Sequence, residues 1–305
     1  MRIVSLVPHA TELLFALGLG DEVIAVTHEC DYPPAAAELP RVTRDVLPSG
    51  LSAREIDAAV RERVESGQAI YELDEEGLAR LAPDLIVAQA LCPVCAVSYE
   101  DVAALAERMP SRPRVVALDP QTFGEAVADA GRIGEVTGRR FEARRLADAA
   151  AVRVEAVERA VAGARRPRVA AIEWFDPVYV AGHWTPQIIE RAWGEDVLGR
   201  PGEPSYVARW ADVAALEPEV VLAIPCGFDA DRARAEALAH APELAELGAR
   251  RVVALDASAY FSRPGPRLVD GLELLAHVLH PELVPDLPDA ARVLEVREGA
   301  LASRA

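Results

Sequence analysis

The sequence contains no lysine and no asparagine, so all 32 of its basic residues are arginine, set against 49 acidic residues and a formal net charge of −17. Without lysine the chain can form no Schiff base and carries no P-loop lysine, and without asparagine it has no N-glycosylation acceptor. A chain this acidic is a poor candidate for binding nucleic acid or an anionic membrane surface, because like charges repel. The polar groups left for a ligand are arginine, carboxylates, histidine, hydroxyls and cysteine.

Long apolar runs are also missing. None reaches the roughly 20 residues needed to span a bilayer, so we expect no membrane span. Residues 1–8 resemble a first strand, with no charged segment followed by an apolar segment and a cleavage site. From this we expect a cytoplasmic protein, or a periplasmic or surface protein if a leader was removed.

Short apolar runs alternate with segments of helical periodicity. Nearly continuous apolar runs are typical of strands covered on both faces, and strand–helix alternation predicts parallel sheets with helices on both sides. The expected helices are Thr11–Leu17, Ala53–Glu65, Glu75–Leu81 and Asp101–Arg108. The expected strands are Ile3–Val7, Val23–Thr27, Leu85–Gln89, Val115–Leu118, Val169–Glu173, Val220–Ile224 and Val252–Leu255.

An internal repeat indicates two related lobes. Residues 81–88 match residues 216–223, and Arg114–Asp119 recurs as Arg251–Asp256. Between the lobes, Phe141–Ala162 has the pattern of one long helix, with Gly134 and Gly138 marking an expected break before it. We therefore predict an N-terminal α/β lobe over 1–120, a helical connector over 121–166, a C-terminal α/β lobe over 167–284 and a fraying tail over 285–305.

Ligands of open parallel α/β sheets bind beyond the carboxyl ends of the strands, so the residues directly after each strand are the candidates for a site. All four cysteines and several aromatic residues fall there. The segments are Pro8–Glu12 with His9, His28–Pro33 with Tyr32, Gln89 to Cys95, Glu173–Trp184 with Phe175 and His183, Pro225–Phe228, and Ser258–Arg263 with Tyr260 and Phe261. Aromatic, mostly apolar walls with a few polar groups suit a bulky planar ligand.

The four cysteines are too sparse for a disulfide scaffold. Cys92 and Cys95 form a C-x-x-C pair, and Cys226 occupies the matching place in the other lobe. Together with His183 they could bind zinc or cobalt, while His9, His28 or Cys30 could also complete a set of four ligands. Two further alternatives stay open: the cysteines are structural, or a pair such as Cys226 and His183 serves a Cys-dependent hydrolase.

Several segments carry a resemblance to a known family. Residues 5–18, the Asp31–Pro34 stretch and the motif at Leu81–Ile86 resemble the cobalamin- and siderophore-type substrate-binding proteins of ABC importers. The resemblance extends to about residue 281. A subgroup often labelled cobalamin-binding protein has segments similar to Cys92–Ala96, Glu173–Trp174 with Ala181–Trp184, Pro225–Phe228 and Tyr260–Arg267.

The resemblance implies two Rossmann-like parallel-sheet lobes joined by a long interlobe helix, as in periplasmic binding proteins, and a corrinoid held in a cleft between them. It implies a binding protein and not an enzyme. His183 or a cysteine would approach the metal centre, while Glu173, Arg263 and backbone groups would meet the ring amides, with Pro8, His9 and Gln89 as further contacts. The aromatic walls would be Tyr32, Trp174, Phe175, Trp184, Phe228, Tyr260 and Phe261.

The sequence departs from the pattern of family members that dock on a permease, which present a glutamate on each lobe. The matching place in the second lobe holds Ala211 with Asp212 beside it, and Glu100 is only a nearby candidate in the first lobe. This departure argues against docking on an ABC permease. The expected partner is a small-molecule corrinoid alone, with a metal ion or metal chelate as the alternative ligand.

Overall fold

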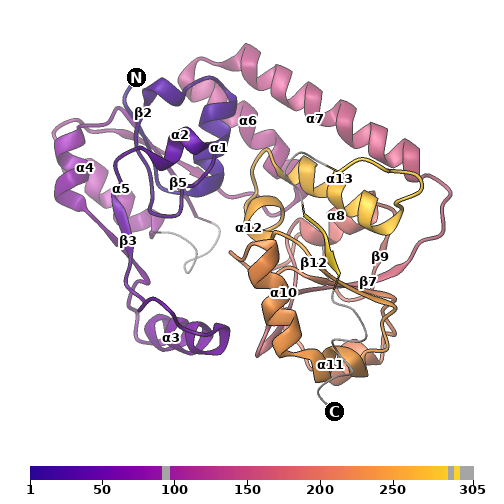
Figure 1. The fold of residues 1–305 in the computed structure, drawn as a ribbon. Coiled ribbons are helices and arrows are strands. Elements are labelled where there is room, and N and C mark those ends of the chain that lie inside the picture. The colour runs from indigo at the N-terminus through magenta and orange to yellow at the C-terminus, as the bar shows by residue number, and fades with distance from the viewer. Residues whose placement is uncertain (91–96, 288–291, 296–305) are drawn as a thin grey trace. The chain divides into compact units, whose positions relative to one another are not determined.

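A computed structural model describes residues 1–90, 97–287 and 292–295 (Figure 1). The chain divides into two compact units. The first unit comprises Met1–Pro120 and Ala126–Asp148, and the second comprises Gln121–Glu125 and Ala149–Ala305. A five-residue segment of the second unit, Gln121–Glu125, therefore interrupts the first unit in sequence. The domain boundaries expected from the sequence remain a prediction.

The first unit alternates strands and helices along most of its length. Its elements are β1 (Ile3–Ser5), α1 (Pro8–Ala16), the 3-10 turn η1 (Gly20–Glu22), β2 (Val23–Ala25), α2 (Pro34–Ala37), β3 (Thr43–Asp45), α3 (Ala53–Glu65), β4 (Tyr71–Leu73), α4 (Glu75–Leu81), β5 (Leu85–Gln89), α5 (Tyr99–Arg108) and β6 (Arg114–Leu118). Helix α6 (Phe123–Thr137) starts in the second unit and continues in the first, and α7 (Arg140–Val161) runs from the first into the second.

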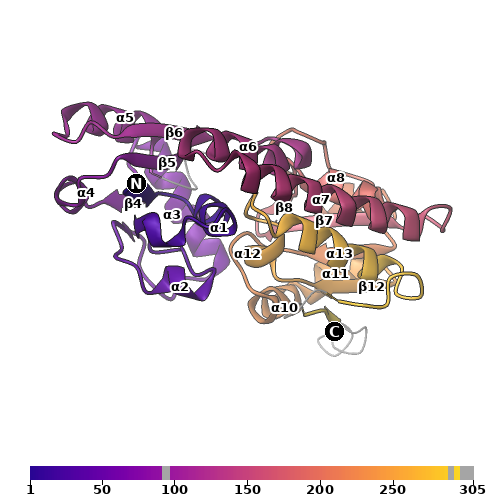
Figure 2. The ribbon, with the colours of Figure 1, turned by 90° about the horizontal axis from the view of Figure 1, so that it is seen from above.

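The second unit has the same alternation with additional strands. Its elements are β7 (Arg168–Phe175), β8 (Val178–Val180), α8 (Thr185–Arg191), β9 (Glu195–Asp196), β10 (Tyr206–Val207), α9 (Trp210–Ala214), β11 (Val220–Ala223), α10 (Ala230–Ala239), α11 (Ala241–Glu246), β12 (Arg251–Ala254), α12 (Ala257–Tyr260), α13 (Leu268–Leu279) and β13 (Leu294–Glu295). Figure 2 shows α13 lying beside α7. Arg153 of α7 joins the two helices by hydrogen bonds to Asp270 (2.5 Å) and Glu273 (2.7 Å).

Both units are built on a parallel sheet, which confirms the predicted α/β fold class. The first sheet has the order β2-β1-β5-β6 with all pairs parallel, and β3 and β4 form a separate antiparallel pair. In the second sheet β7, β11 and β12 are parallel neighbours, and β9 adds a parallel partner to β7. The strands β8, β10 and β13 are antiparallel additions.

Side chains of the first sheet alternate between two apolar clusters. Ile3 and Val87 belong to one cluster with α1 and α6, whereas Val4 and Ile86 belong to the other with α4 and α5. Because successive residues of a strand point to opposite faces, this arrangement covers the sheet on both sides. The nearly continuous apolar runs of the sequence result from that double coverage.

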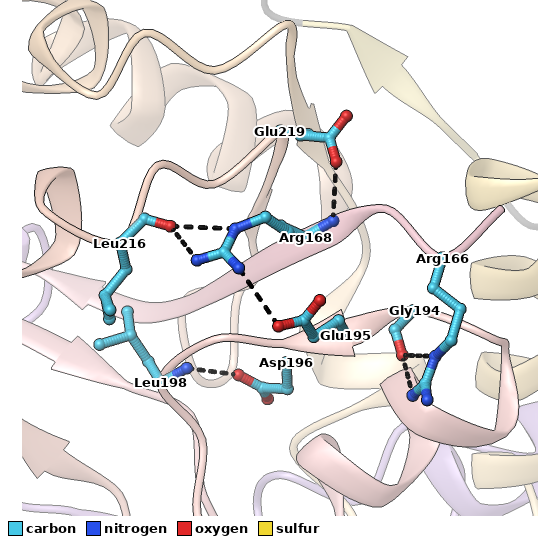
Figure 3. A network of polar contacts seen from close by, with 8 residues as sticks. All are labelled: Arg166, Arg168, Gly194, Glu195, Asp196, Leu198, Leu216 and Glu219. Atoms are coloured by element: carbon cyan, nitrogen blue, oxygen red, sulfur yellow. Dashed lines mark hydrogen bonds and ion pairs between the residues drawn. The ribbon is translucent and has the colours of Figure 1, made fainter.

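The sequence repeat corresponds to a shared fastening at the amino ends of the strands. In the first unit the Arg2 guanidinium donates to the Leu81 carbonyl (2.6 Å), and the Arg2 amide donates to Asp84 (2.7 Å). In the second unit Arg168 donates to the Leu216 carbonyl (2.5 Å), and its amide donates to Glu219 (3.2 Å), as Figure 3 shows. In both units, the same contacts thus join the first strand to the segment that precedes its neighbour in the sheet, β5 in the first unit and β11 in the second.

The first helix begins earlier than the sequence pattern suggested. We expected Pro8 and His9 in a loop and a helix from Thr11, but α1 starts at Pro8. Proline is favoured in the first turn of a helix, because its missing N–H would lack a helical partner there. The chain therefore passes from β1 into α1 with only Leu6 and Val7 between them.

The expected helix break lies at one glycine and not at two. Gly138, with φ of 77°, separates α6 from α7. Gly134 lies inside α6, where a Cβ would come within 2.5 Å of the Ala143 side chain. Gly134 therefore permits close packing of the two helices, which periodicity alone could not distinguish from a break.

The first turn of α6 is anchored within the second unit. The Phe123 amide donates to the Gln187 side chain (2.7 Å), and the Arg191 guanidinium lies over the Phe123 ring at 5.4 Å from its centroid. These two contacts explain why Gln121–Glu125 belongs to the second unit.

Two strand additions differ from the sequence expectation. Strand β7 runs on to Phe175 and turns back as β8, so that residues 168–180 form a hairpin where a loop was expected after Glu173. In the tail, expected to fray, Leu294 and Glu295 pair with β12. Within the described residues no helix is long and apolar enough to cross a membrane.

Candidate ligand-binding site

The structure divides the candidates in the first unit into buried and exposed residues. His9 is 2% exposed within α1, and Gln89 is 6% exposed at the end of β5. Tyr32, in contrast, is 44% exposed in the segment between β2 and α2. Of these three, Tyr32 alone presents a large aromatic surface.

The cysteines occupy unlike environments. Cys30 is fully buried, with its sulfur 3.1 Å from the hydroxyls of both Thr11 and Thr27, so packing accounts for it. Cys226 is exposed. Cys92 and Cys95 lie outside the described residues, and among residues 1–90, 97–287 and 292–295 no group of three potential ligands is placed to hold a metal ion. The zinc or cobalt site therefore remains a prediction.

The extension of β7 places adjacent aromatic residues on opposite faces. The ring of Trp174 meets Phe228 edge-on, with centroids 5.4 Å apart and planes at 65°. Phe175 is 1% exposed and packs between Trp210 and His240, stacking on the imidazole at 5.4 Å. Strand alternation thus directs Trp174 to the strand-end loops and Phe175 into the interior of the second unit.

His240, which stacks on Phe175 of the β7–β8 hairpin, has a raised pKa. A hydrogen bond to Glu236 raises the pKa of His240 against the opposing effect of burial, and Glu243 and Asp176 act in the same direction as Glu236. Its ring lies 3.5 Å from the Glu236 carboxylate and 3.9 Å from that of Glu243. The imidazole behind Phe175 is therefore held among three carboxylates.

The loop after β8 is fastened to the segment that precedes β10. The His183 amide donates to the Glu203 carbonyl (2.6 Å), and Ser205 joins the Gly182 amide (3.2 Å) to the Glu173 carboxylate (2.7 Å). A Cβ at Gly182 would lie 2.4 Å from the Glu203 carbonyl oxygen, so only glycine permits this approach. Glu173 and the half-buried His183 are thereby brought to the same group of hydrogen-bonded loop residues.

Trp184, Tyr260 and Phe261 are mostly buried, at 5%, 6% and 3% exposure. The Trp184 indole N–H donates to the Phe261 carbonyl at 2.6 Å. These side chains therefore join the loop before α8 to the segment after β12, and they lie beneath the surface rather than on it.

Three strand-end loops of the second unit, residues 173–184, 225–228 and 258–263, form a loop cluster that is joined by hydrogen bonds from backbone amides. The Cys226 amide donates to the Glu173 carbonyl (3.1 Å), the Gly227 amide donates to the Ser262 hydroxyl (3.2 Å), and the Ser258 amide donates to the Phe228 carbonyl (3.1 Å). Loops fixed to one another in this way present their side chains in set positions, which favours binding.

Charged side chains lie close to the aromatic residues of the loop cluster. The Arg232 guanidinium lies 3.6 Å from the centroid of Phe228, which also contacts Trp174. Burial raises the pKa of Asp256, while the nearby charges of Arg267 and Arg263 act against that shift. Arg263 is half-buried. The aromatic wall is thus bordered by arginine and carboxylate groups.

Ser205, Arg232 and Ser262 were not among the site residues predicted from the sequence. Arg232 lies four residues after Phe228, beyond the helix cap Asp229, and that spacing could have indicated a contact with the ring. Ser262 stood within a strand-end segment but had no feature to single it out. Ser205 has no such signal, because its hydrogen bond to Glu173 joins positions 32 residues apart.

Two α/β units, of which the second has hydrogen-bonded loops at the carboxyl ends of its parallel strands, are typical of a class of ligand-binding protein. The family model for the periplasmic binding protein family matches residues 3–251 of this chain. The chain belongs to this family, as the sequence resemblance implied.

Particular relatives extend the comparison. The vitamin B12-binding protein of Vibrio cholerae is 61% identical over 41 residues, which is 13% of this chain and 15% of the relative. That of Pectobacterium carotovorum is 51% identical over 41 residues, with the same two shares. The matched segment therefore spans about 15% of the length of these curated relatives.

Solved structures show the same fold over nearly the whole chain. The periplasmic vitamin B12-binding protein BtuF of Vibrio cholerae superposes with a TM-score of 0.65 at 23% identity, covering 91% of this chain and 96% of that one. A periplasmic heme-binding protein from Pseudomonas aeruginosa gives a TM-score of 0.69 at 21% identity, covering 96% and 94%. At these identities the likeness concerns the fold.

Proposed function

We propose that this chain binds a corrinoid, such as cobalamin, as a binding protein and not as an enzyme. The observation that carries the proposal is the 41-residue segment that is 61% identical to a vitamin B12-binding protein. Family membership supports a role in binding. The metal-ion and Cys-hydrolase alternatives have no comparable support in the described residues.

The loop cluster of the second unit supplies surfaces that suit this ligand. A corrin ring is flat and largely apolar on its faces, with amide groups at its edge. Trp174, set edge-on against Phe228, offers an aromatic wall, and such walls are typical of sites for planar ligands. Glu173 and Arg263 supply polar groups for edge amides, and His183 supplies an imidazole for the metal centre.

The candidates fall into two roles under this proposal. In the second unit, Trp174, His183, Glu173 and Arg263 are assigned to ligand contact, and the exposed Tyr32 of the first unit stays a predicted contact. Gln89, Phe175, Trp184, Tyr260 and Phe261 are assigned to support, because each is at most 6% exposed. Pro8 and His9, buried in α1, are assigned to support as well.

The names of the family and of its relatives favour the periplasmic alternative over the cytoplasmic expectation, and we propose a periplasmic location. The expectation that the chain does not dock on a permease stays a prediction. Asp212 is paired with Arg209 at 2.7 Å, and Glu100 accepts from Ser98 at 3.1 Å, so both carboxylates are engaged locally.

Titration of the purified chain with cyanocobalamin, dicyanocobinamide and hemin tests the proposal. We expect a shifted corrinoid absorption spectrum with one ligand bound per chain, and a loss of affinity on the order of tenfold or more for Trp174→Ala. Phe141→Ala is the control, because this ring on α7 is 71% exposed and lies outside the loop cluster. Binding of hemin with neither corrinoid bound would overturn the proposal.

A further inference from the structure

Three tryptophans of the second unit differ in what their indole N–H groups meet. The indole of Trp184 donates to the Phe261 carbonyl (2.6 Å), and that of Trp193 donates to the Ala164 carbonyl (2.8 Å). The indole nitrogen of Trp174 is shielded from solvent, yet it has no hydrogen-bond partner in the part of the chain that the structure describes. Trp174 therefore carries a buried donor that the described residues do not satisfy.

Such a donor is costly to retain. A buried N–H without a partner costs roughly 1–3 kcal/mol, whereas a phenylalanine at the same place would fill the apolar contact without that cost. Buried polar groups are satisfied in the great majority of cases, so an exception calls for a functional explanation.

The surroundings of Trp174 hold the indole in place. Its ring meets the edge of Phe228, and Arg232 lies over the Phe228 ring. The backbone beside it is tied by the hydrogen bond from the Cys226 amide to the Glu173 carbonyl. The donor is thus positioned by the loop after β11 and by α10, which borders the candidate ligand-binding surface.

We propose that the Trp174 indole N–H is a specificity donor for an acceptor oxygen of the ligand, either a side-chain amide carbonyl or a phosphate oxygen. The inference rests on the proposed corrinoid function. The nitrogen is shielded from solvent, so the ligand reaches it by displacing the groups that cover it. The acceptor then satisfies a donor that the described residues leave unpaired, and the affinity gains from removing that cost.

Trp174→Phe tests the inference, since it keeps an aromatic ring and removes the donor. We expect corrinoid affinity to fall about tenfold with no decrease in melting temperature, because no internal hydrogen bond is lost. Trp193→Phe is the matched control. It removes a donor that is satisfied within the fold, so it should lower the melting temperature and leave corrinoid affinity unchanged.

Two corrinoids distinguish the source of the acceptor. Cobinamide retains the amide side chains and lacks the nucleotide phosphate of cobalamin. A loss of affinity for both ligands assigns the acceptor to an amide carbonyl, and a loss for cobalamin alone assigns it to the phosphate. Equal affinities of wild type and Trp174→Phe for both would overturn the inference while leaving the proposed function intact.

Indole ¹⁵N–¹H correlation spectra of the wild-type chain give an independent reading. The four tryptophans give four indole signals, assigned from single Phe variants. We expect the Trp174 proton signal to move downfield on adding cobinamide or cobalamin, and the Trp193 signal to stay in place. An unmoved Trp174 signal in a chain that binds corrinoid would overturn the inference even if Trp174→Phe failed to fold, while absence of corrinoid binding by the wild type would remove the proposed function and the inference together.

Discussion

The two units share one fastening and differ in the segment that their first strand leads into. In both, an arginine at the start of that strand donates to a carbonyl just before the strand that neighbours it in the sheet, β5 or β11. The strand pairs also run in the same register (Ile3 with Leu85, Val169 with Val220). Even the turns agree, because Ala82 and Glu217 occupy matching places with φ of 42° and 45°. The repeat is therefore retained at the amino ends of the strands, away from the candidate site.

At the carboxyl ends the units diverge. Strand β1 has three residues and leads into α1, whereas β7 has eight and continues into the hairpin with β8. The second unit thereby acquires a segment, residues 173–184, that carries most of its candidate ligand contacts. A common scaffold is thus kept at one edge of the sheets, while the other edge of the second unit is extended into the segment that carries the candidate contacts.

The largest effect should come from disturbing that elaborated segment. Gly182→Ala places a Cβ 2.4 Å from the Glu203 carbonyl oxygen and 2.6 Å from the Ser205 amide nitrogen, so backbone must move. We expect a loss of about 3 kcal/mol in the free energy of unfolding, measured in urea, together with weaker corrinoid binding. A Cβ at Gly131 in α6 would meet no atom within 4 Å outside the backbone of its own helix, so Gly131→Ala should be neutral or stabilising. A urea unfolding midpoint of Gly182→Ala equal to that of the wild type would contradict the expectation.

The shared fastening can be broken in each unit in turn. Arg168→Ala removes the hydrogen bonds to Leu216 and the ion pair with Glu195 (3.2 Å), and should cost about 2 kcal/mol of unfolding free energy. Arg2→Ala should cost less, because Arg2 is exposed and its bonds are more accessible to water. Chemical denaturation of both variants measures the difference. A larger loss for Arg2→Ala would mean that the fastening matters more in the unit without the hairpin.

A smaller effect concerns pH and the support of the hairpin. The folded-state pKa of His240 lies above its ordinary value of 6.5, so the native chain binds this proton more tightly than the unfolded chain. The resulting stabilisation is complete below pH 6.5 and is lost as the pH rises through the folded-state pKa. Unfolding free energies measured across this range should show that decline in the wild type and lose it in His240→Gln. The same slope in both proteins would show that His240 is not its source.

The smallest effect is expected at the exposed thiol. Cys226→Ser should change the unfolding free energy by less than about 0.5 kcal/mol, whereas Cys30→Ser alters a fully buried thiol and should cost more. Zinc and cobalt titrations of wild type and Cys226→Ser test the metal alternative alongside. Stoichiometric metal binding that disappears in the variant would favour a thiol site over the corrinoid proposal.

Much of the fold could be predicted because local pattern and packing agree. The helices Ala53–Glu65 and Glu75–Leu81 and the strand Leu85–Gln89 were predicted with their observed bounds. Other elements depend on partners that periodicity cannot reveal. Strands β3 and β4 have three residues each, and β13 is a strand only because it pairs with β12. Likewise, Gly134 has the composition of a helix break, but its role is set by Ala143 on the next helix.

For the candidate site, the sequence predicted which loops are involved but not which side chains meet. Strand ends identified the loops that carry Trp174 and Phe228, whose contact the structure shows. Which aromatic rings are buried could not be predicted, because β7 extends beyond its apolar run and strand alternation then separates Trp174 from Phe175. The contact between Trp184 and Phe261 joins positions 77 residues apart and has no local signature.

The five residues that the second unit takes from the middle of the chain affect how the protein can be divided. A fragment that begins at Ala149 would lack Phe123, leaving Arg191 without the ring beneath it and Gln187 without the amide that it accepts from. A fragment ending at Pro120 would in turn lack the part of α6 that packs on α1. Neither half is a continuous stretch of sequence, so one cut cannot release both intact, and a fragment meant to study the second unit's surface alone must join Gln121–Glu125 to Ala149–Ala305.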